Sequence, residues 1–216
     1  MPGTVIFDMD GVLTDSEPVI NESAVKALRE HGVDAKPEDF IPFVGTGEDS
    51  YIGGVAEKYG LEYRPAMKQR VYEIYLDILP GRLRAFPGIH DLVETLRDQG
   101  WRVAVASSAD RIKVEANLKA IDLPPSGFSV IVAGEDVVKK KPAPDIFLTA
   151  AERVGTVPRS CCVVEDAPSG IRAAKAAGMR CVAVAQTFTE DELRRESPDL
   201  VKATVAELIP DDFRTA

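Results

Sequence analysis

The chain has 216 residues, and 45% of them are hydrophobic, which is enough apolar material for an ordinary folded core. Its formal net charge of −9 argues against nucleic-acid binding, because that function requires a basic face. No apolar stretch reaches the roughly 20 residues needed to span a bilayer, so we also expect no membrane partner. An anionic substrate must therefore depend on local cations.

The first predicted strand covers residues 4–8 and carries two aspartates into the loop that follows it. The segment FDMDGVLTDS places Asp8 and Asp10 at the carboxyl edge of the predicted sheet, where ligands bind in open α/β folds. Two such acids repel each other unless a proton or a cation joins them, and oxygen ligands suit Mg²⁺. A carboxylate beside Mg²⁺ can attack phosphorus and form an aspartyl-phosphate. A solvated acidic turn is the alternative, so other segments must decide.

The next segment, residues 17–84, contains no convincing strand. We interpret it as an α-helical cap domain, inserted between the first strand and a core domain that comprises residues 1–16 and 85–216. The helix-like parts of the insertion are residues 19–31, 38–43, 49–59 and 65–78.

Strands and helices alternate in the rest of the chain, which indicates an α/β fold with a Rossmann-like parallel sheet. With the first strand, the expected strands are residues 4–8, 102–106, 130–133, 162–165 and 181–185. The expected helices are residues 90–99, 111–120, 145–154 and 170–177. Cys161, Cys162 and Cys181 lack the spacing of a metal site or a disulfide framework, so we expect buried thiols in a reducing compartment.

Polar residues occur in three further segments of the core, two of which lie at the carboxyl end of a predicted strand. Ser107 and Ser108 follow WRVAVA, Lys141 precedes a proline turn, and Glu165 and Asp166 follow CCVV. Each has an ordinary explanation as a helix cap, a solvated lysine or a complement to a helix dipole. Together with the first two aspartates they supply a nucleophile, an acid/base, a phosphate-holding hydroxyl and cation, and acids for a metal.

With these four motifs in order, the chain resembles the haloacid dehalogenase superfamily, in the branch of β-phosphoglucomutase and phosphoglycolate phosphatase. The resemblance implies that Asp8 is the nucleophile and a Mg²⁺ ligand. It implies that Asp10 is the general acid/base, whose backbone carbonyl also faces the metal.

The same resemblance assigns the remaining core motifs. Ser107, assisted by Ser108, and Lys141 are expected to hold the substrate phosphate, and Asp166 is expected to ligate Mg²⁺. Glu165 is then expected either to ligate Mg²⁺ as well or to contact a residue that does.

The cap segment departs from the β-phosphoglucomutases, which carry a histidine after the first motif and an arginine in the first cap loop. Here Ile20 stands at the first position, and the loop FVGTGEDS has no arginine, which disfavours mutase activity. Gly45, Thr46 and Gly47 are a candidate backbone nest for an anionic substrate group, with an ordinary turn as the alternative. Arg70 is a candidate substrate contact, with a solvated helix face as the alternative.

The segments FVGTGE and VASSADRIKVEANLKA also resemble the dehalogenase-like domain of chloroplast suppressor-of-quenching proteins. Because MPGTVIF runs directly into a strand, we expect a cytoplasmic location for a full-length chain and the plastid stroma if a leader has been trimmed.

These observations lead to one functional hypothesis. We expect a Mg²⁺-dependent phosphatase that hydrolyses a small phosphorylated metabolite, such as a sugar phosphate, and that is a monomer or a weak homodimer. A phosphomutase and a regulatory domain without turnover are the alternatives.

Overall fold

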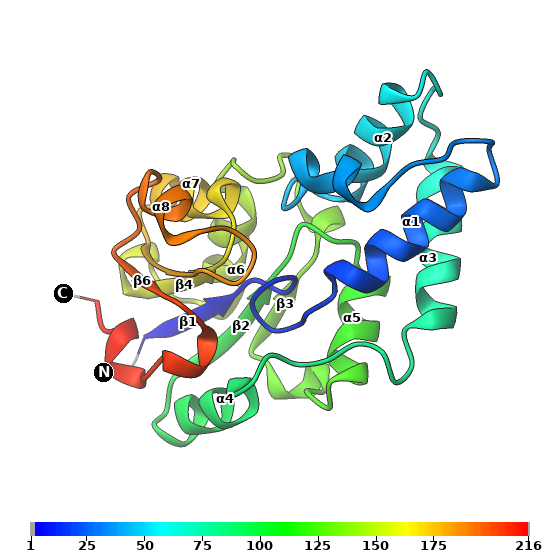
Figure 1. The fold of residues 1–216 in the computed structure, drawn as a ribbon. Helices are drawn as coiled ribbons and strands as arrows, with labels where there is room; N and C mark the ends of the chain where they lie inside the picture. Colours follow the sequence, from blue (N-terminus) through cyan, green and yellow to red (C-terminus); the bar gives the residue numbers. More distant parts are fainter. Residues whose placement is uncertain (1–2, 216) are drawn as a thin grey trace.

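A central six-stranded parallel sheet organises the protein (Figure 1). The computed structural model describes residues 3–215, and the strand order is β3-β2-β1-β4-β5-β6. The strands are β1 (Thr4–Phe7), β2 (Arg102–Ala106), β3 (Val130–Val132), β4 (Cys161–Glu165), β5 (Arg180–Val184) and β6 (Leu200–Lys202). The order reverses between β1 and β4, so the carboxyl ends of these two central strands flank the position where open α/β sheets bind ligands.

Helices cover both faces of the sheet because alternate strand residues point to opposite sides. Ile6 packs into the hydrophobic cluster on one face, whereas Val5 and Phe7 pack into the cluster on the other. The first face is covered by α6 (Asp145–Val154), α7 (Pro168–Ala176) and α8 (Glu190–Arg194), and the second by α4 (Ile89–Asp98), α5 (Arg111–Ala120) and the 3₁₀ turn Pro210–Phe213. The expected Rossmann-like sheet is therefore confirmed.

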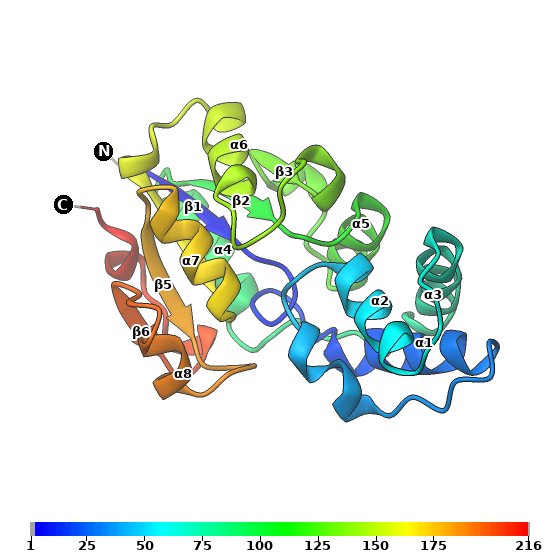
Figure 2. The same ribbon diagram turned by 90° about the horizontal axis from the view of Figure 1, so that it is seen from above.

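Residues 17–84, which we call the helical insert, form a group of helices beside the sheet (Figures 1 and 2). The insert contains α1 (Glu17–Arg29), the 3₁₀ helix Pro37–Phe43, α2 (Glu48–Lys58) and α3 (Pro65–Ile78). The chain leaves and returns at one place, because the Asp15 amide donates to the Arg84 carbonyl at 3.0 Å and Thr14 bridges to Ala85. Its exact domain bounds stay a prediction.

Strand β6 and helix α8 were not expected from the sequence. Strand β6 has three half-buried residues at the edge of the sheet, and α8 has five residues, so each covers fewer than two periods of an apolar pattern. The segment expected as a helix near residues 38–43 is a 3₁₀ helix with Pro42 inside it, where an α-helix would lose a backbone hydrogen bond.

The three cysteines are buried and free, as expected. Within the described residues 3–215, we find no helix with the length and apolar character needed to cross a membrane.

Candidate active site

The carboxyl ends of β1 and β4 bring the predicted acidic residues together. Asp8 directly follows β1, and its amide donates to the Val164 carbonyl of β4 at 3.0 Å, so the two strands remain paired up to the site. Glu165 ends β4 and Asp166 follows it. Adjacent parallel strands thus place residues that are far apart in sequence at one edge of the sheet.

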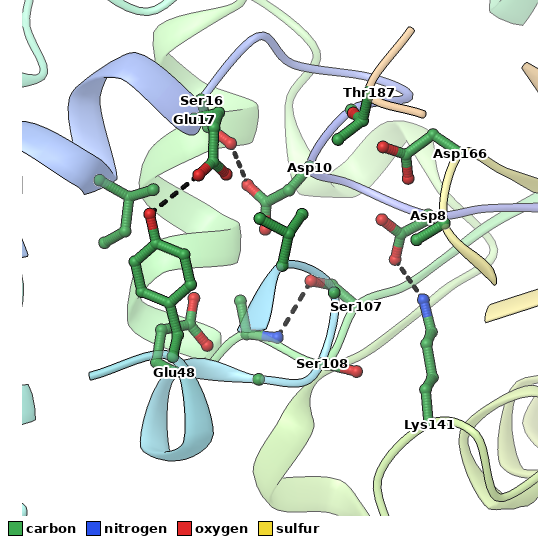
Figure 3. Close-up of a pocket in the computed structure, with 18 of the residues that line it drawn as sticks. Asp8, Asp10, Ser16, Glu17, Glu48, Ser107, Ser108, Lys141, Asp166 and Thr187 are labelled. Atoms are coloured by element: carbon green, nitrogen blue, oxygen red, sulfur yellow. Dashed lines mark hydrogen bonds and ion pairs between the residues drawn. The ribbon is translucent and has the colours of Figure 1, made fainter. Parts of the chain in front are cut away.

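Three buried carboxylates and one buried ammonium group form the centre of the site. One carboxylate oxygen from each of Asp8, Glu165 and Asp166 lies within 4.8 Å of the others. The Nζ atom of Lys141 lies 2.5 Å from Asp8 Oδ1 and 2.5 Å from Glu165 Oε1. The other Glu165 oxygen accepts the amides of Asp166 and Ala167, each at 3.0 Å. These bonds orient Glu165, and Figure 3 shows Asp8 facing Lys141 and Asp166.

This group carries more carboxylates than the ammonium can balance. Burial raises the pKa of Asp8 to about 7, even though the Lys141 ammonium opposes that change. Burial also raises the pKa of Asp166, and the neighbouring charges of Glu165 and Asp8 add to the effect. Buried acids of this kind require protons or a cation, and three oxygen donors with one compensating charge fit Mg²⁺.

A single cavity of about 400 Å³ contains these residues and the predicted phosphate-holding serines. The predicted core residues that line it are Asp8, Asp10, Ser107, Ser108, Lys141, Glu165 and Asp166. Ser107 follows β2, and its Oγ accepts the Ala109 amide at 3.1 Å, which leaves its hydroxyl proton available. The buried Oγ of Ser108 has no hydrogen-bond partner within residues 3–215, so this hydroxyl is also available to a ligand.

The carboxylate of Asp10 points away from the three acids and toward Ser16, just before the helical insert begins (Figure 3). One oxygen lies 2.7 Å from Lys113 Nζ, and the other accepts the Ser16 hydroxyl. Because this carboxylate stands apart from Asp8 within the same cavity, its position suits a proton carrier more than a metal ligand. Metal contact through the Asp10 backbone stays a prediction.

The glycine-containing loop of the insert lies against the core. Gly45 and Gly47 line the cavity and have φ angles of +77° and +91°, which favour glycine. A Cβ at Gly45 would stand 3.1 Å from the Ala167 Cβ, so glycine permits this close approach. Thr46 is absent from the cavity lining among the residues described, and its amide and hydroxyl both donate to the Phe43 carbonyl. The Thr46 amide is thus already bonded within the turn, whereas a backbone nest for an anion would need this amide to be free.

Arg70 pairs with acids of the insert. Its guanidinium contacts Glu30 at 2.8 Å and Glu73 at 2.9 Å, and the side chain is 44% exposed. Within the described part of the chain it is not among the residues lining the cavity. The arrangement therefore favours the solvated-face interpretation over the predicted substrate contact.

A second buried ion-pair network, which was not predicted from the sequence, lies in the same cavity. Lys113 is 3% exposed, and its Nζ lies 3.1 Å from Glu48 Oε1 in addition to its contact with Asp10. Glu17 accepts the Tyr51 hydroxyl at 2.8 Å. The available signal was the polar pair at positions 113 and 117, which share one face of α5 because they are four residues apart.

A family model described as "Haloacid dehalogenase-like hydrolase" matches residues 5–184 of this chain. The chain belongs to this family. A relative named Protein SUPPRESSOR OF QUENCHING 1, chloroplastic, from Arabidopsis thaliana, is 45% identical over 215 residues, which cover 98% of this chain but only 20% of that protein. The "Phosphorylated carbohydrates phosphatase" of Thermotoga maritima is 32% identical over 178 residues and 81% of each chain.

Solved structures of the family show the same architecture. CbbY from Rhodobacter sphaeroides, crystallised with phosphate, has a TM-score of 0.86 and 27% identity over 96% of each chain. A mutant of that protein was crystallised with xylulose-(1,5)bisphosphate, at the same TM-score. The fold and the family branch expected from the motifs are thereby confirmed.

Proposed function

We propose that this protein is a Mg²⁺-dependent phosphatase that hydrolyses a phosphomonoester of a small metabolite. The observation that supports this most directly is the contact of Asp8 with Lys141 inside a cluster of buried acids. In that arrangement an oxygen nucleophile is held by a cation beside a group of metal-ligating oxygens. The phosphatase among the relatives supports the same reaction class.

The first half of the reaction transfers the phosphoryl group to the protein. Asp8 attacks phosphorus, the ester P–O bond breaks, and Asp10 gives its proton to the leaving alkoxide. The Ser107 hydroxyl and the Lys141 ammonium hold the phosphate oxygens. Mg²⁺ held by Asp8 and Asp166 would neutralise charge on the phosphoryl group.

The second half regenerates the free enzyme. Asp10, now a carboxylate, accepts a proton from water, and the water oxygen attacks phosphorus of the aspartyl-phosphate. The acyl-phosphate P–O bond breaks, so inorganic phosphate leaves and the Asp8 carboxylate returns. Gly45 and Gly47 of the helical insert line this cavity, and in this proposal the insert limits the entry of water.

A panel of phosphorylated metabolites, assayed for phosphate release with and without Mg²⁺, tests the proposal. Asp8→Asn is the blank, and Asp98→Asn, at an exposed position of α4, is the matched control. We expect Mg²⁺-dependent release with the parent and with Asp98→Asn, and a loss of at least about 10³-fold with Asp8→Asn. Equal release by Asp8→Asn would contradict the assignment of the nucleophile.

Analysis of the sugar products on the same panel, with and without an added bisphosphate, separates the alternatives. A mutase would yield an isomerised sugar and require a bisphosphate, whereas a regulatory domain would show no turnover. For the compartment, the relative named as chloroplastic supports the plastid alternative.

A further inference from the structure

The cavity has two chemically different ends. The phosphoryl end contains Asp8, Ser107 and Lys141, where the reaction of the proposed phosphatase takes place. Across the cavity, Figure 3 shows Glu17 and Glu48 of the helical insert. We call this side the insert end, and the lining residues that the insert contributes include Glu17, Ile20, Phe43, Glu48 and Tyr51. A substrate with its phosphate beside Asp8 must place the rest of its leaving group at the insert end.

Both cationic side chains of the cavity are already paired. Among the described residues that line it, only Lys113 and Lys141 carry a positive charge. Lys141 is held by the acids of the phosphoryl end. Lys113 is 3% exposed and lies between Asp10 at 2.7 Å and Glu48 at 3.1 Å. The insert end therefore has no uncommitted cation with which to bind a second anionic group.

The insert end also resists added negative charge. Glu48 lies in the first turn of α2 and is buried, and Glu17 lies in the first turn of α1. Burial raises the pKa of Glu17, even though the Tyr51 hydroxyl and the Lys113 ammonium oppose that change, and the Asp10 and Glu48 charges add to the rise. A substrate anion placed there would encounter the same desolvation and the same repulsion.

The remaining groups suit an uncharged polyhydroxy compound. Carboxyl oxygens of Glu17 and Glu48 can accept hydrogen bonds from hydroxyl groups, and such charge-assisted bonds are strong when water is excluded. Ile20, Phe43 and Phe86 supply apolar walls against which the C–H surface of a sugar or polyol packs.

On the basis of the proposed phosphatase function, we propose that Glu48 and Glu17 determine specificity by rejecting substrates with a second anionic group. The preferred substrate class is the monophosphate of a neutral sugar or polyol. Bisphosphates and phosphorylated sugar acids are disfavoured. The CbbY mutant crystallised with xylulose-(1,5)bisphosphate, by contrast, holds a compound with two phosphate groups.

Two matched substrate pairs test this inference. Sorbitol 6-phosphate and 6-phosphogluconate differ only in the alcohol or carboxylate at the far end, and glucose 6-phosphate and glucose 1,6-bisphosphate differ in a second phosphate. We expect kcat/KM to favour the first member of each pair by about tenfold or more, mainly through KM, because the second charge meets buried carboxylates. p-Nitrophenyl phosphate serves as a general substrate that reports the phosphatase reaction itself.

Variants locate the selectivity. Glu48→Gln removes the charge with little change in shape, and we expect each kcat/KM ratio to fall by about threefold or more. Glu57→Gln, on the exposed part of the same helix, is the control and should keep the parent ratios. Glu17→Gln is a second variant with the same expected direction. Thermal unfolding of each variant confirms that a folded protein is being compared.

The outcomes separate this inference from the function on which it rests. Hydrolysis of p-nitrophenyl phosphate together with equal or better use of 6-phosphogluconate or glucose 1,6-bisphosphate would overturn the specificity and leave the phosphatase standing. Parent ratios in both folded glutamine variants would overturn the roles of Glu48 and Glu17. Absence of Mg²⁺-dependent hydrolysis of every substrate would overturn the phosphatase and the inference with it.

Discussion

The Nζ atom of Lys141 lies 2.5 Å from Oδ1 of Asp8, although 133 residues separate the two along the chain. Both side chains are nearly or fully buried, and the same ammonium also contacts Glu165. One cation thus compensates acids at the ends of two central strands. Lys141 therefore stabilises the folded core in addition to its proposed role in holding the substrate phosphate.

Replacing Lys141 by Met should destabilise the metal-free protein by about 3–5 kcal/mol, because it leaves buried carboxylates without their counter-charge. Urea unfolding in the presence of EDTA measures the change. Lys139→Met, at an exposed position of the same lysine run, is the control. If Lys141→Met proved as stable as this control, the compensating role would be wrong.

Mg²⁺ should raise the thermal midpoint, because an ion that binds only the folded protein stabilises it by mass action. At 100 times the dissociation constant the gain is about 2.7 kcal/mol. Adding beryllofluoride, which mimics a phosphoryl group on an aspartate, should raise the midpoint further. Both shifts should shrink in Asp166→Asn, which removes one of the three clustered carboxylates. An unchanged midpoint with both ligands would count against the metal site.

The stability of the metal-free protein should respond to pH through Asp8. Burial raises its pKa from 3.8 to about 7, so the folded protein holds a proton that the unfolded chain releases. The resulting stabilisation is complete below the unfolded pKa of 3.8 and is lost as pH rises through about 7. Asp166, whose pKa burial also raises, acts in the same direction.

A pH series of urea unfolding curves measures this effect. The difference between the parent and Asp8→Asn isolates the contribution of Asp8 from that of other acids. We expect the parent to lose stability relative to the variant as pH rises, and Mg²⁺ to reduce that loss because it replaces the proton. A difference that stayed constant with pH in EDTA would rule out the raised pKa.

Replacing Lys113 by Met should remove the only ammonium that contacts Asp10 within the described residues. We expect a loss of about 3 kcal/mol, at the lower end for buried pairs because the Asp10 side chain keeps 30% exposure. The double variant Lys113→Met/Glu48→Gln should recover part of the lost free energy of unfolding, because the Glu48 carboxylate that would lack a partner is removed as well. Strictly additive losses in this double-mutant cycle would show that Lys113 and Glu48 are not coupled.

The sequence alone determined which residues gather at the phosphoryl end. Asp8, Ser107 and Glu165 each end or follow a recognisable apolar strand, and parallel strands must bring their carboxyl ends to one edge. Local pattern and the rules of sheet topology are sufficient for that prediction. The edge strand β6 was not predicted, because its three half-buried residues give too little periodic signal.

Only the tertiary structure decided what faces the other end of the cavity. Lys113 belongs to a sheet-covering helix and Glu48 to the helical insert, and no sequence pattern links them. The sequence makes Arg70 a candidate substrate contact, whereas in the structure it pairs with Glu30. How an insert sits on a core depends on the packing of whole surfaces, so the charges that meet across that boundary follow from three-dimensional contacts rather than from strand or helix periodicity.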